Sequence, residues 1–588
     1  MHKELLLEWC RGLQKLQIGK DWPGAFRGGI LCPACGRIHG RSADAMIAFL
    51  CAGELSGDES YFCSAEELFR WSEENVTCGD GSYINDPGNP WKGVTIFSLQ
   101  NLVLCLEKYR KYLSEEIVQS MLVRIEKSAS FYHDHIDTFD TNINYYIAGA
   151  AGLAAAGILL GRDDLRKKAD ELMNQSIACI TEDNLIIGEG KCKKTAFTAC
   201  TPRGCQAIDI GYNVEENIPA LLHYGLLTSD QSILEKAEEV MDAHLNFLLP
   251  DGAWDNSWGT RNAKWSYWGS RTSDGCQEAY AILPQKRFQM AAGLNLELLG
   301  RCTHDGLLTG GPMYHLSGEK TCVHHTICHA KSLAVCLSLG HEIQRQEYVP
   351  EVFPDGAKLW NKGTVCTARR GKWYASIAAG DYQYVKGSTP SGGMVTLLHE
   401  AEWGPIFAAT MTRYKLTEPF NMQYPLHWET ECQTMRIETE GGSSVTCMEA
   451  ELKVKESGGR VWVTVRGKLE RKYGYRIEYM LTDRSFRITA ITDAPGARLL
   501  LPVIASGEEQ VAFDECKQAA YIYKDGMRLC INGSGKLFMN RGGALKDGFK
   551  RSFNPVGGFI YVQAFIPMQA GEEVSVDFFV EESYESEN

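Results

Sequence analysis

The stretch from Trp254 to Gly275 holds the densest group of side chains suited to chemistry. It contains four Trp, one Tyr, two Arg, one Lys and two Asp, and almost no aliphatic residues. A segment without Leu, Ile or Val lacks the apolar stripe of a core helix. Indole faces suit the C–H face of a sugar ring, and guanidinium groups bind carboxylates through paired hydrogen bonds. The stretch therefore predicts a binding site for an acidic sugar.

The side chains of this stretch divide into two predicted roles. Asp255 and Asp274 bracket the aromatic residues and are candidates for acid–base catalysis. Arg41 and Trp91 come from earlier loops and are expected to reach the same cleft. The predicted substrate contacts are Arg41, Trp91, Asn256, Trp258, Arg261, Trp265, Tyr267, Trp268 and Arg271.

A second motif runs from Asp209 to Glu216. Apolar residues at helical spacing follow it, which places Tyr212 near the start of a helix and Glu215 and Glu216 one turn further on. The positive end of the helix dipole favours an anion near Tyr212. A capped helix with solvated glutamates explains the same residues equally well.

Two further motifs raise the question of a metal. His324 and His325 lie in a predicted helix with His329, where they could bind zinc, polarise a uronate carboxylate or shuttle a proton. A buried, hydrogen-bonded cluster is an equal alternative. Cys32 and Cys35 have the spacing of half a zinc site, but no second Cys-x-x-Cys follows at a suitable distance. We predict no cofactor and no bound metal.

The composition describes an ordinary globular chain of 588 residues, with 44% hydrophobic and 23% charged residues. A formal net charge of −14 argues against a nucleic-acid or anionic-membrane surface. The apolar run that ends at Gly161 is short for a membrane span and is predicted to be a buried helix. The 21 Cys show no framework spacing, and the N-terminus has no signal-peptide pattern. We therefore expect a cytoplasmic protein.

The hydrophobic periodicity changes along the chain. Helical spacing recurs up to about residue 345, in segments separated by Gly, Pro, Asn and Asp. Further on, alternating strands such as 452–454 and 461–465 flank a glycine turn. We predict an α+β multidomain chain: an (α/α) toroid, incomplete or with six hairpins, over residues 1–345, and an antiparallel β-sandwich over 346–588.

Two reactions on uronic acids fit these residues. A glycosidase needs one protonated and one ionised carboxyl group. A β-eliminating lyase instead neutralises the uronate carboxylate and removes the adjacent proton with Tyr or His. Asn256 or Arg261 would be the neutralising group, and the candidate bases are Tyr212, Tyr267, His324 and His325. The composition does not choose between the two.

The expected architecture resembles the heparinase II/III and alginate-lyase group of polysaccharide lyases. The motifs at 91–97, 209–216, 255–275 and 324–331 look closer to the β-glucuronidases of glycoside hydrolase family 154. Membership would imply removal of terminal glucuronic acid from oligosaccharides and association of subunits. The several carboxyl groups around Tyr212 favour hydrolysis over elimination.

The leading hypothesis is therefore an exo-acting β-glucuronidase that acts on an acidic oligosaccharide as a homo-oligomer. Asp274 or Asp255, with Glu215 or Glu216, would form the acid–base pair, and Arg261, Arg271 and Arg41 would bind the carboxylate. A lyase for uronate-containing glycans is the alternative. A non-catalytic protein that binds acidic glycans is a weaker one.

Overall fold

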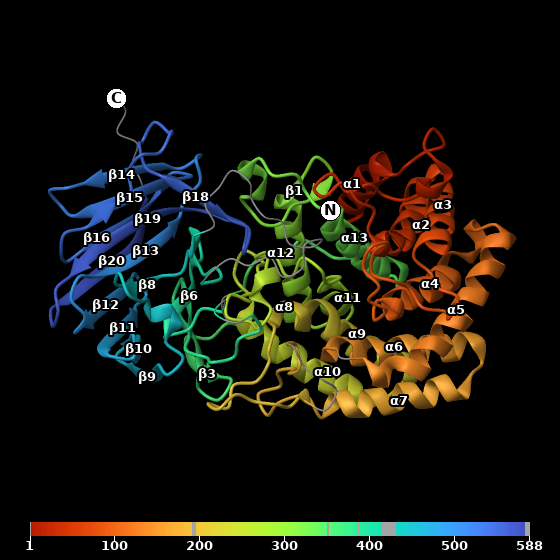
Figure 1. The fold of residues 1–588 in the computed structure, drawn as a ribbon, viewed down its shortest axis with the longest axis horizontal. Coiled ribbons are helices and arrows are strands. Elements are labelled where there is room, and N and C mark those ends of the chain that lie inside the picture. Colours follow the sequence, from red (N-terminus) through yellow and green to blue (C-terminus); the bar gives the residue numbers. More distant parts are fainter. Residues whose placement is uncertain are drawn as a thin grey trace.

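The computed structural model describes residues 2–139, 141–190, 196–349, 352–385, 387, 389–412 and 431–582. A helical part is followed by antiparallel sheets, and the two lie side by side along the longest axis of the molecule (Figure 1). The predicted fold class is confirmed. The predicted boundary at 345/346 falls in the connection between the last helix, which ends at Ser338, and strand β3, which begins at Gly356.

The helices pack mainly as consecutive pairs. The pairs are α2 (Ala45–Ser56) with α3 (Ser60–Asn75), α4 (Thr95–Tyr109) with α5 (Glu115–His135), α6 (Ile143–Leu160) with α7 (Asp163–Ile177), and α9 (Ile218–Thr228) with α10 (Gln231–His244). The other long helices are α1 (His2–Leu16), α12 (Lys286–Arg301) and α13 (Val323–Ser338). Short connections within each pair make its two helices antiparallel.

One helix of each pair belongs to an inner ring of helices. The helices α2, α4, α6, α9, α11 (Gln277–Tyr280) and α13 contact one another in a closed circle. Helices α2 and α6 are buried on nearly all sides, whereas α7 and α10 bury a single apolar stripe. Because an antiparallel outer helix follows α2, α4, α6 and α9, these inner helices run in the same direction. Their N-termini gather at one end of the ring.

Helix α6 is long and apolar enough to cross a membrane by length and composition. Its mean hydropathy is 1.6, and 72% of its residues are buried inside the protein. It contacts α4, α7 and α9, as a core helix of the ring does. The sequence-based prediction of a buried helix is confirmed at this position.

Antiparallel strands build the second part. A five-stranded sheet has the order β3-β4-β5-β6-β7, and an eight-stranded sheet has the order β14-β15-β16-β20-β12-β11-β10-β9. A further sheet has the order β17-β19-β13-β8, with β18 beside β19. The bounds are β3 Gly356–Trp360, β4 Val365–Arg370, β5 Trp373–Ala378, β6 Met394–Glu400, β7 Gly404–Ala408, β8 Arg436–Glu438, β9 Glu451–Ser457, β10 Arg460–Leu469, β11 Tyr473–Leu481, β12 Phe486–Thr492, β13 Ala497–Ile504, β14 Gln510–Asp514, β15 Ala519–Lys524, β16 Met527–Gly533, β17 Phe538–Met539, β18 Arg551–Asn554, β19 Phe559–Met568 and β20 Glu573–Glu582. The predicted hairpin is formed by β9 and β10.

The five-stranded sheet lies between the ring and the eight-stranded sheet (Figure 1). Successive side chains of a strand point to opposite faces. Leu397 of β6 accordingly packs into the core of the helical part, and Leu398 packs into the core of the sheets. A sheet that is buried on both faces fixes the helical ring firmly against the β part.

Candidate active site

Tyr212 stands at the start of a helix that is deformed just after it. Helix α8 (Ile210–Tyr212) continues as a π turn over Asn213–Asn217 and then as α9. Asp209 caps the start, because its side chain accepts a hydrogen bond from Tyr212 N at 3.1 Å. Single π turns within helices occur frequently at functional sites. The helix places Tyr212 at the end of the ring where the inner helices begin.

The phenol oxygen of Tyr212 lies beside a hydroxyl group and a cation. It hydrogen-bonds to Thr272 Oγ1, and Lys264 Nζ donates to Tyr212 at 3.3 Å and to Thr272 at 3.2 Å. The Arg261 guanidinium carbon lies 3.8 Å from the centroid of the Tyr212 ring. All four side chains are 7% exposed or less. Positive charges at these distances favour a phenolate, which is the form that removes a proton.

Arg261 is held over the tyrosine by two carboxyl groups. Its backbone N donates to Asp209 Oδ2 at 2.7 Å, and its guanidinium donates to Glu189 Oε2 at 3.2 Å. Burial raises the pKa of Glu189 to about 7, although the Arg261 charge opposes this shift. Asn144 N donates to the other oxygen of Glu189 at 3.0 Å. Glu189 therefore positions Arg261 from behind.

Arg41 belongs to a buried ion network in the centre of the ring. It comes from a 3-10 turn before α2, and it donates to Asp44 at 2.6 Å and to Asp274 at 2.7 Å. Lys331 donates to the second oxygen of Asp274 at 2.6 Å. Burial alone would raise the pKa of Asp274, but Lys331 and Arg41 lower it below its usual range. Asp274 is thus held ionised and is a poor proton donor, so within the predicted acid–base pair it could serve only as the ionised carboxyl group.

Glu216 lies in the π turn between α8 and α9 and faces the same network. It accepts a hydrogen bond from Asn144 Nδ2 at 2.6 Å, and Arg41 Nη1 lies 4.0 Å from its other oxygen. Burial, followed by the charge of Asp274, raises the pKa of Glu216 to about 8. Glu216 is therefore largely protonated at neutral pH and stabilises the network without adding a full charge.

His324 is the second residue of helix α13 and lies beside the cationic groups. Its Nδ1 is 3.4 Å from Cys328 Sγ, and its ring meets the ring of His39 edge-on at 5.8 Å. Burial, followed by the charge of Arg41, holds the pKa of His324 well below its usual range, and Lys264 adds to this. A neutral imidazole at this place can accept or pass on a proton.

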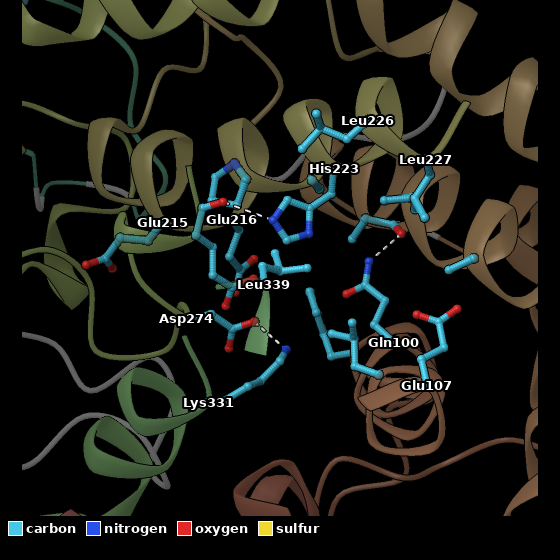
Figure 2. A pocket seen from close by; sticks show the side chains of 18 of the residues that line it. Gln100, Glu107, Glu215, Glu216, His223, Leu226, Leu227, Asp274, Lys331 and Leu339 are labelled. Atoms are coloured by element: carbon cyan, nitrogen blue, oxygen red, sulfur yellow. Dashed lines mark hydrogen bonds and ion pairs between the residues drawn. The ribbon is translucent and has the colours of Figure 1, made fainter. Parts of the chain in front are cut away.

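A separate cavity of about 240 Å³ opens at the other end of the ring. Figure 2 shows Leu226 and Leu227 at one side and Glu216, Asp274 and Lys331 at the other. The cavity is lined along the length of α4, α6 and α9, from Phe97, Ala148 and Pro219 to Lys108, Ala155 and Leu227, and by Leu339 after α13. The ion network therefore separates this apolar cavity from the Tyr212 end.

The predicted aromatic wall for a sugar is not formed. Trp265 and Trp268 are 0% exposed, and Tyr267 and Arg271 are 1% exposed. The Trp265 indole donates to Trp254 O, and the Trp268 indole donates to Thr309 O. These side chains fill the core because indole and guanidinium stems also bury well when their N–H groups are satisfied. The substrate-binding prediction for these four residues is corrected accordingly.

The same stretch contacts the β part of the chain. Tyr267 donates to Asp251 at 2.9 Å and packs edge-on against Phe559. Trp258 is 5% exposed and packs against Phe247.

Of the predicted aromatic contacts, Trp91 is half-buried, and its indole donates to Tyr145 at 3.1 Å just before α4. Trp91 alone keeps an accessible ring at the N-terminal end.

Asp255 and Asn256 serve the framework. Asp255 accepts hydrogen bonds from Ser257 and from Tyr374 of β5, at 2.6 and 2.7 Å, which fastens the ring to the sheet. Asn256 donates to Asp209 at 3.0 Å and accepts from Ile210 N at 2.7 Å. Both carboxylate oxygens of Asp255 are thus engaged, which argues against a catalytic role for Asp255. The amide nitrogen of Asn256 keeps a second N–H, so carboxylate neutralisation by Asn256 stays a prediction.

The side chains of Glu215 and His325 also make hydrogen bonds within the protein framework. Glu215 accepts from Ser270 N at 2.8 Å and Ser273 Oγ at 2.6 Å, and its other oxygen is 3.3 Å from His329 Nε2. His325 Nδ1 bonds to Arg271 O at 3.0 Å, and burial lowers the pKa of His325 to about 3. Both predicted catalytic residues therefore hold the 269–273 segment in place.

Lys264, Thr272 and Asn144 were not predicted as site residues. Lys264 and Thr272 lie in the stretch that composition singled out, but nothing in their spacing relates them to Tyr212. Asn144 lies in a run that reads as a buried helix. The partners that define their roles lie 8 to 72 positions away from them in the sequence.

Comparison with solved structures defines the class of protein. The chain is similar to heparinase III (TM-score 0.54, 13% identity, 96% of this chain and 79% of that chain). It is also similar to chondroitin AC lyase of Streptomyces coelicolor A3 (TM-score 0.55, 12% identity, 98% and 79%). A ring of helices followed by antiparallel sheets is thus the fold of toroid polysaccharide lyases.

The sequence comparisons identify one family within this fold class. Residues 6–352 match the ulvan lyase N-terminal domain, and residues 357–581 match the ulvan lyase C-terminal domain. A broad-specificity ulvan lyase of Formosa agariphila is 37% identical over 446 residues, which are 74% of this chain and 69% of that protein. The chain belongs to the ulvan lyase family.

This membership corrects the leading hypothesis of the sequence analysis. An exo-acting β-glucuronidase, and with it a glycoside hydrolase, is contradicted by a match to lyase domains over most of the chain. The resemblance to lyase-shaped folds was right, and the preference for hydrolysis was wrong. The number of carboxyl groups near Tyr212 was a poor indicator of hydrolysis, because those groups are buried in the framework.

Proposed function

We propose that this protein is a polysaccharide lyase that cleaves uronate-containing glycans of the ulvan type by β-elimination. Membership in the ulvan lyase family supports the reaction class. The single observation that carries the chemistry is the Tyr212 phenol, which lies between Lys264 and Arg261 at the end of the ring where helices begin. Tyrosine flanked by cations is suited to proton removal at neutral pH.

The elimination requires a base and an acid. Tyr212 as phenolate would take the proton from the carbon next to the uronate carboxylate. The electron pair left behind forms a carbon–carbon double bond as the neighbouring glycosidic C–O bond breaks. The leaving oxygen then needs a proton, which the newly formed Tyr212 phenol can donate. No water is consumed, and the enzyme returns to its starting state once Tyr212 is again ionised.

Acidification of the substrate carbon depends on positive charge around the uronate carboxylate. Lys264 and Arg261 bring positive charge beside Tyr212. Arg261 also pairs with Glu189, and Arg41 pairs with Asp44 and Asp274. Helices α6, α8 and α13 also begin at this end, and helix N-termini favour anions. His324 is a second candidate for proton transfer because its imidazole is neutral.

An acidic polysaccharide as the substrate follows from this proposal. The named relative is a broad-specificity ulvan lyase, so we expect ulvan to be cleaved by this chain as well. A cytoplasmic location and association into homo-oligomers stay predictions of the sequence analysis.

The direct test is a digestion of ulvan in which the ultraviolet absorbance and the mass of the products are measured. Elimination is expected to give products with ultraviolet absorbance from the new double bond and a new non-reducing end that is one water lighter than hydrolysis would leave. The anomeric oxygen of the new reducing end exchanges with solvent in either reaction. A polysaccharide without uronic acid serves as the substrate control and should stay intact. Products that carry the mass of the added water and lack the absorbance would demonstrate hydrolysis and overturn the proposal.

A further inference from the structure

Three cysteines and one histidine from distant parts of the chain meet beside the ring. Cys32 Sγ lies 3.8 Å from Cys322 Sγ, and His39 Nε2 lies 3.7 Å from Cys322 Sγ and 3.4 Å from Cys35 Sγ. The ligand atoms of Cys32, His39 and Cys322 all lie within 4.8 Å of one another. Three soft or borderline donors are thus gathered around one point, and Cys35 Sγ adjoins them through His39.

These separations match the edges of a zinc tetrahedron. Zinc binds sulfur at about 2.3 Å and imidazole nitrogen at about 2.0–2.1 Å, which places two sulfurs about 3.8 Å apart and sulfur and nitrogen about 3.6 Å apart. A disulfide would require two sulfurs about 2.05 Å apart. The observed spacing suits one shared ion and is too long for a bond between Cys32 and Cys322.

The histidine is oriented as a zinc ligand usually is. His39 Nδ1 lies 3.2 Å from Asp86 Oδ1, which leaves Nε2 directed at the sulfur atoms. Gly40 N also donates to Asp86 Oδ1 at 3.1 Å and fixes the carboxylate. A carboxylate on the remote nitrogen holds the imidazole ring and its tautomer in metal sites. This contact is an observation independent of the cysteine cluster.

The loop between Cys32 and His39 is folded tightly around the same point. Cys32 N donates to Arg37 O at 2.8 Å, and Gly36 N donates to Cys32 O at 2.9 Å. Gly36 has a φ of +65°, which a glycine adopts without strain. Cys32 is 0% exposed, His39 and Cys322 are each 1% exposed, and Cys35 is half-buried. Three buried ligands and one reachable ligand leave a route for an ion to enter.

We propose that Cys32, Cys35, His39 and Cys322 bind one zinc ion in a closed, structural site. Four protein ligands fill the tetrahedron, so no position is left for water or substrate. The proposal differs from the sequence-based prediction of no metal, because Cys322 supplies a ligand in place of the missing second Cys-x-x-Cys.

The site ties together two segments that reach the candidate active site. His39 directly precedes the turn at 40–44 that carries Arg41. Cys322 is the residue before helix α13, whose second residue is His324. The ion would hold the start of α13 against the 32–44 segment. We therefore assign it a positioning role for Arg41 and His324, and no part in the reaction itself.

Metal analysis of the full-length protein tests the proposal. The chain is produced in zinc-supplemented medium, dialysed without chelator and measured by elemental mass spectrometry. About one zinc per chain is expected. After replacement by cobalt, visible bands of tetrahedral cobalt and a near-ultraviolet thiolate-to-cobalt band are expected. Removal of the ion with a chelator should lower the Tm by about 5 °C or more, and added zinc should restore it.

Two substitutions with matched controls locate the ion. Cys322→Ser and Cys35→Ser should each lose most of the zinc. Cys336→Ser changes a buried thiol on the same helix, and Cys78→Ser changes a half-buried thiol in another loop, so both should keep it.

Two results would overturn the proposal. One is a folded wild-type protein with less than about 0.1 zinc per chain and no cobalt spectrum, including the case of a Cys32–Cys322 disulfide found by mass spectrometry. The other is zinc that stays bound in both site variants. Because the wild-type measurements need no variant, failure of a variant to fold leaves the test intact.

Discussion

The two ends of the helical ring differ in charge and in chemistry. At the end where the inner helices begin, Tyr212 lies beside Lys264 and Arg261. At the other end, Leu226 and Leu227 line an apolar cavity (Figure 2). Parallel helix dipoles make the first end favourable for anions and the second unfavourable. This apolar cavity is therefore the weaker candidate for an acidic glycan, and the charged, closely packed end is the stronger one.

The ion network of Arg41, Asp274 and Lys331 lies between these ends. It closes the ring from inside. In the proposed mechanism, carboxyl groups build the framework of the site, whereas tyrosine and the cations form its reactive part. Three substitutions test this division.

The largest effect is expected from Tyr212→Phe. Loss of the phenol oxygen removes the proposed base and acid, so kcat for ulvan cleavage should fall by about 10²–10⁴-fold. Tyr224→Phe is the matched control, since it makes the same change at the far end of the same helix, where the hydroxyl donates to Asp170. Initial rates from ultraviolet absorbance measure both. Equal rates for wild type and Tyr212→Phe would remove Tyr212 from the mechanism.

Glu216→Gln should change the dependence of stability on pH. The folded protein keeps a proton on Glu216 up to about pH 8, whereas the unfolded chain loses it near pH 4.5. The unfolded state thus binds fewer protons in this window, and stability falls as pH rises through it. The variant lacks this loss, so its Tm relative to wild type should rise by roughly 1–5 °C between pH 5 and pH 9.

Thermal unfolding at the two pH values measures this difference. Glu74→Gln removes an exposed glutamate and serves as the control, with no pH-dependent difference expected. A Glu216→Gln variant that loses stability relative to wild type as the pH rises would show that Glu216 is ionised in the fold.

The smallest effect is expected from Leu227→Trp, which places a large ring in the apolar cavity. If the glycan binds only at the Tyr212 end, kcat/KM for ulvan should change by less than about twofold, as for most surface substitutions. A tenfold or greater fall in kcat/KM would mean that the cavity binds substrate and that the comparison between the two ends is wrong.

The aromatic stretch shows how far sequence reasoning reached. Its composition singled out a segment that supplies Lys264, Arg261 and Thr272, three of the side chains that lie around Tyr212. It could not tell which side chains face the substrate, because Trp265 and Trp268 have the same composition in a core as in a sugar site. The zinc ligands show the same limit, since Cys322 lies 290 residues after Cys32.

The sequence by itself determined the division into helices and strands and the place of Tyr212 at a helix start, because hydrophobic period and capping are local properties. Only the tertiary structure decided which charged groups surround Tyr212, which carboxyl groups are neutralised, and which cysteines meet. Those outcomes depend on closure of the ring, which brings together residues far apart in the chain and removes them from water.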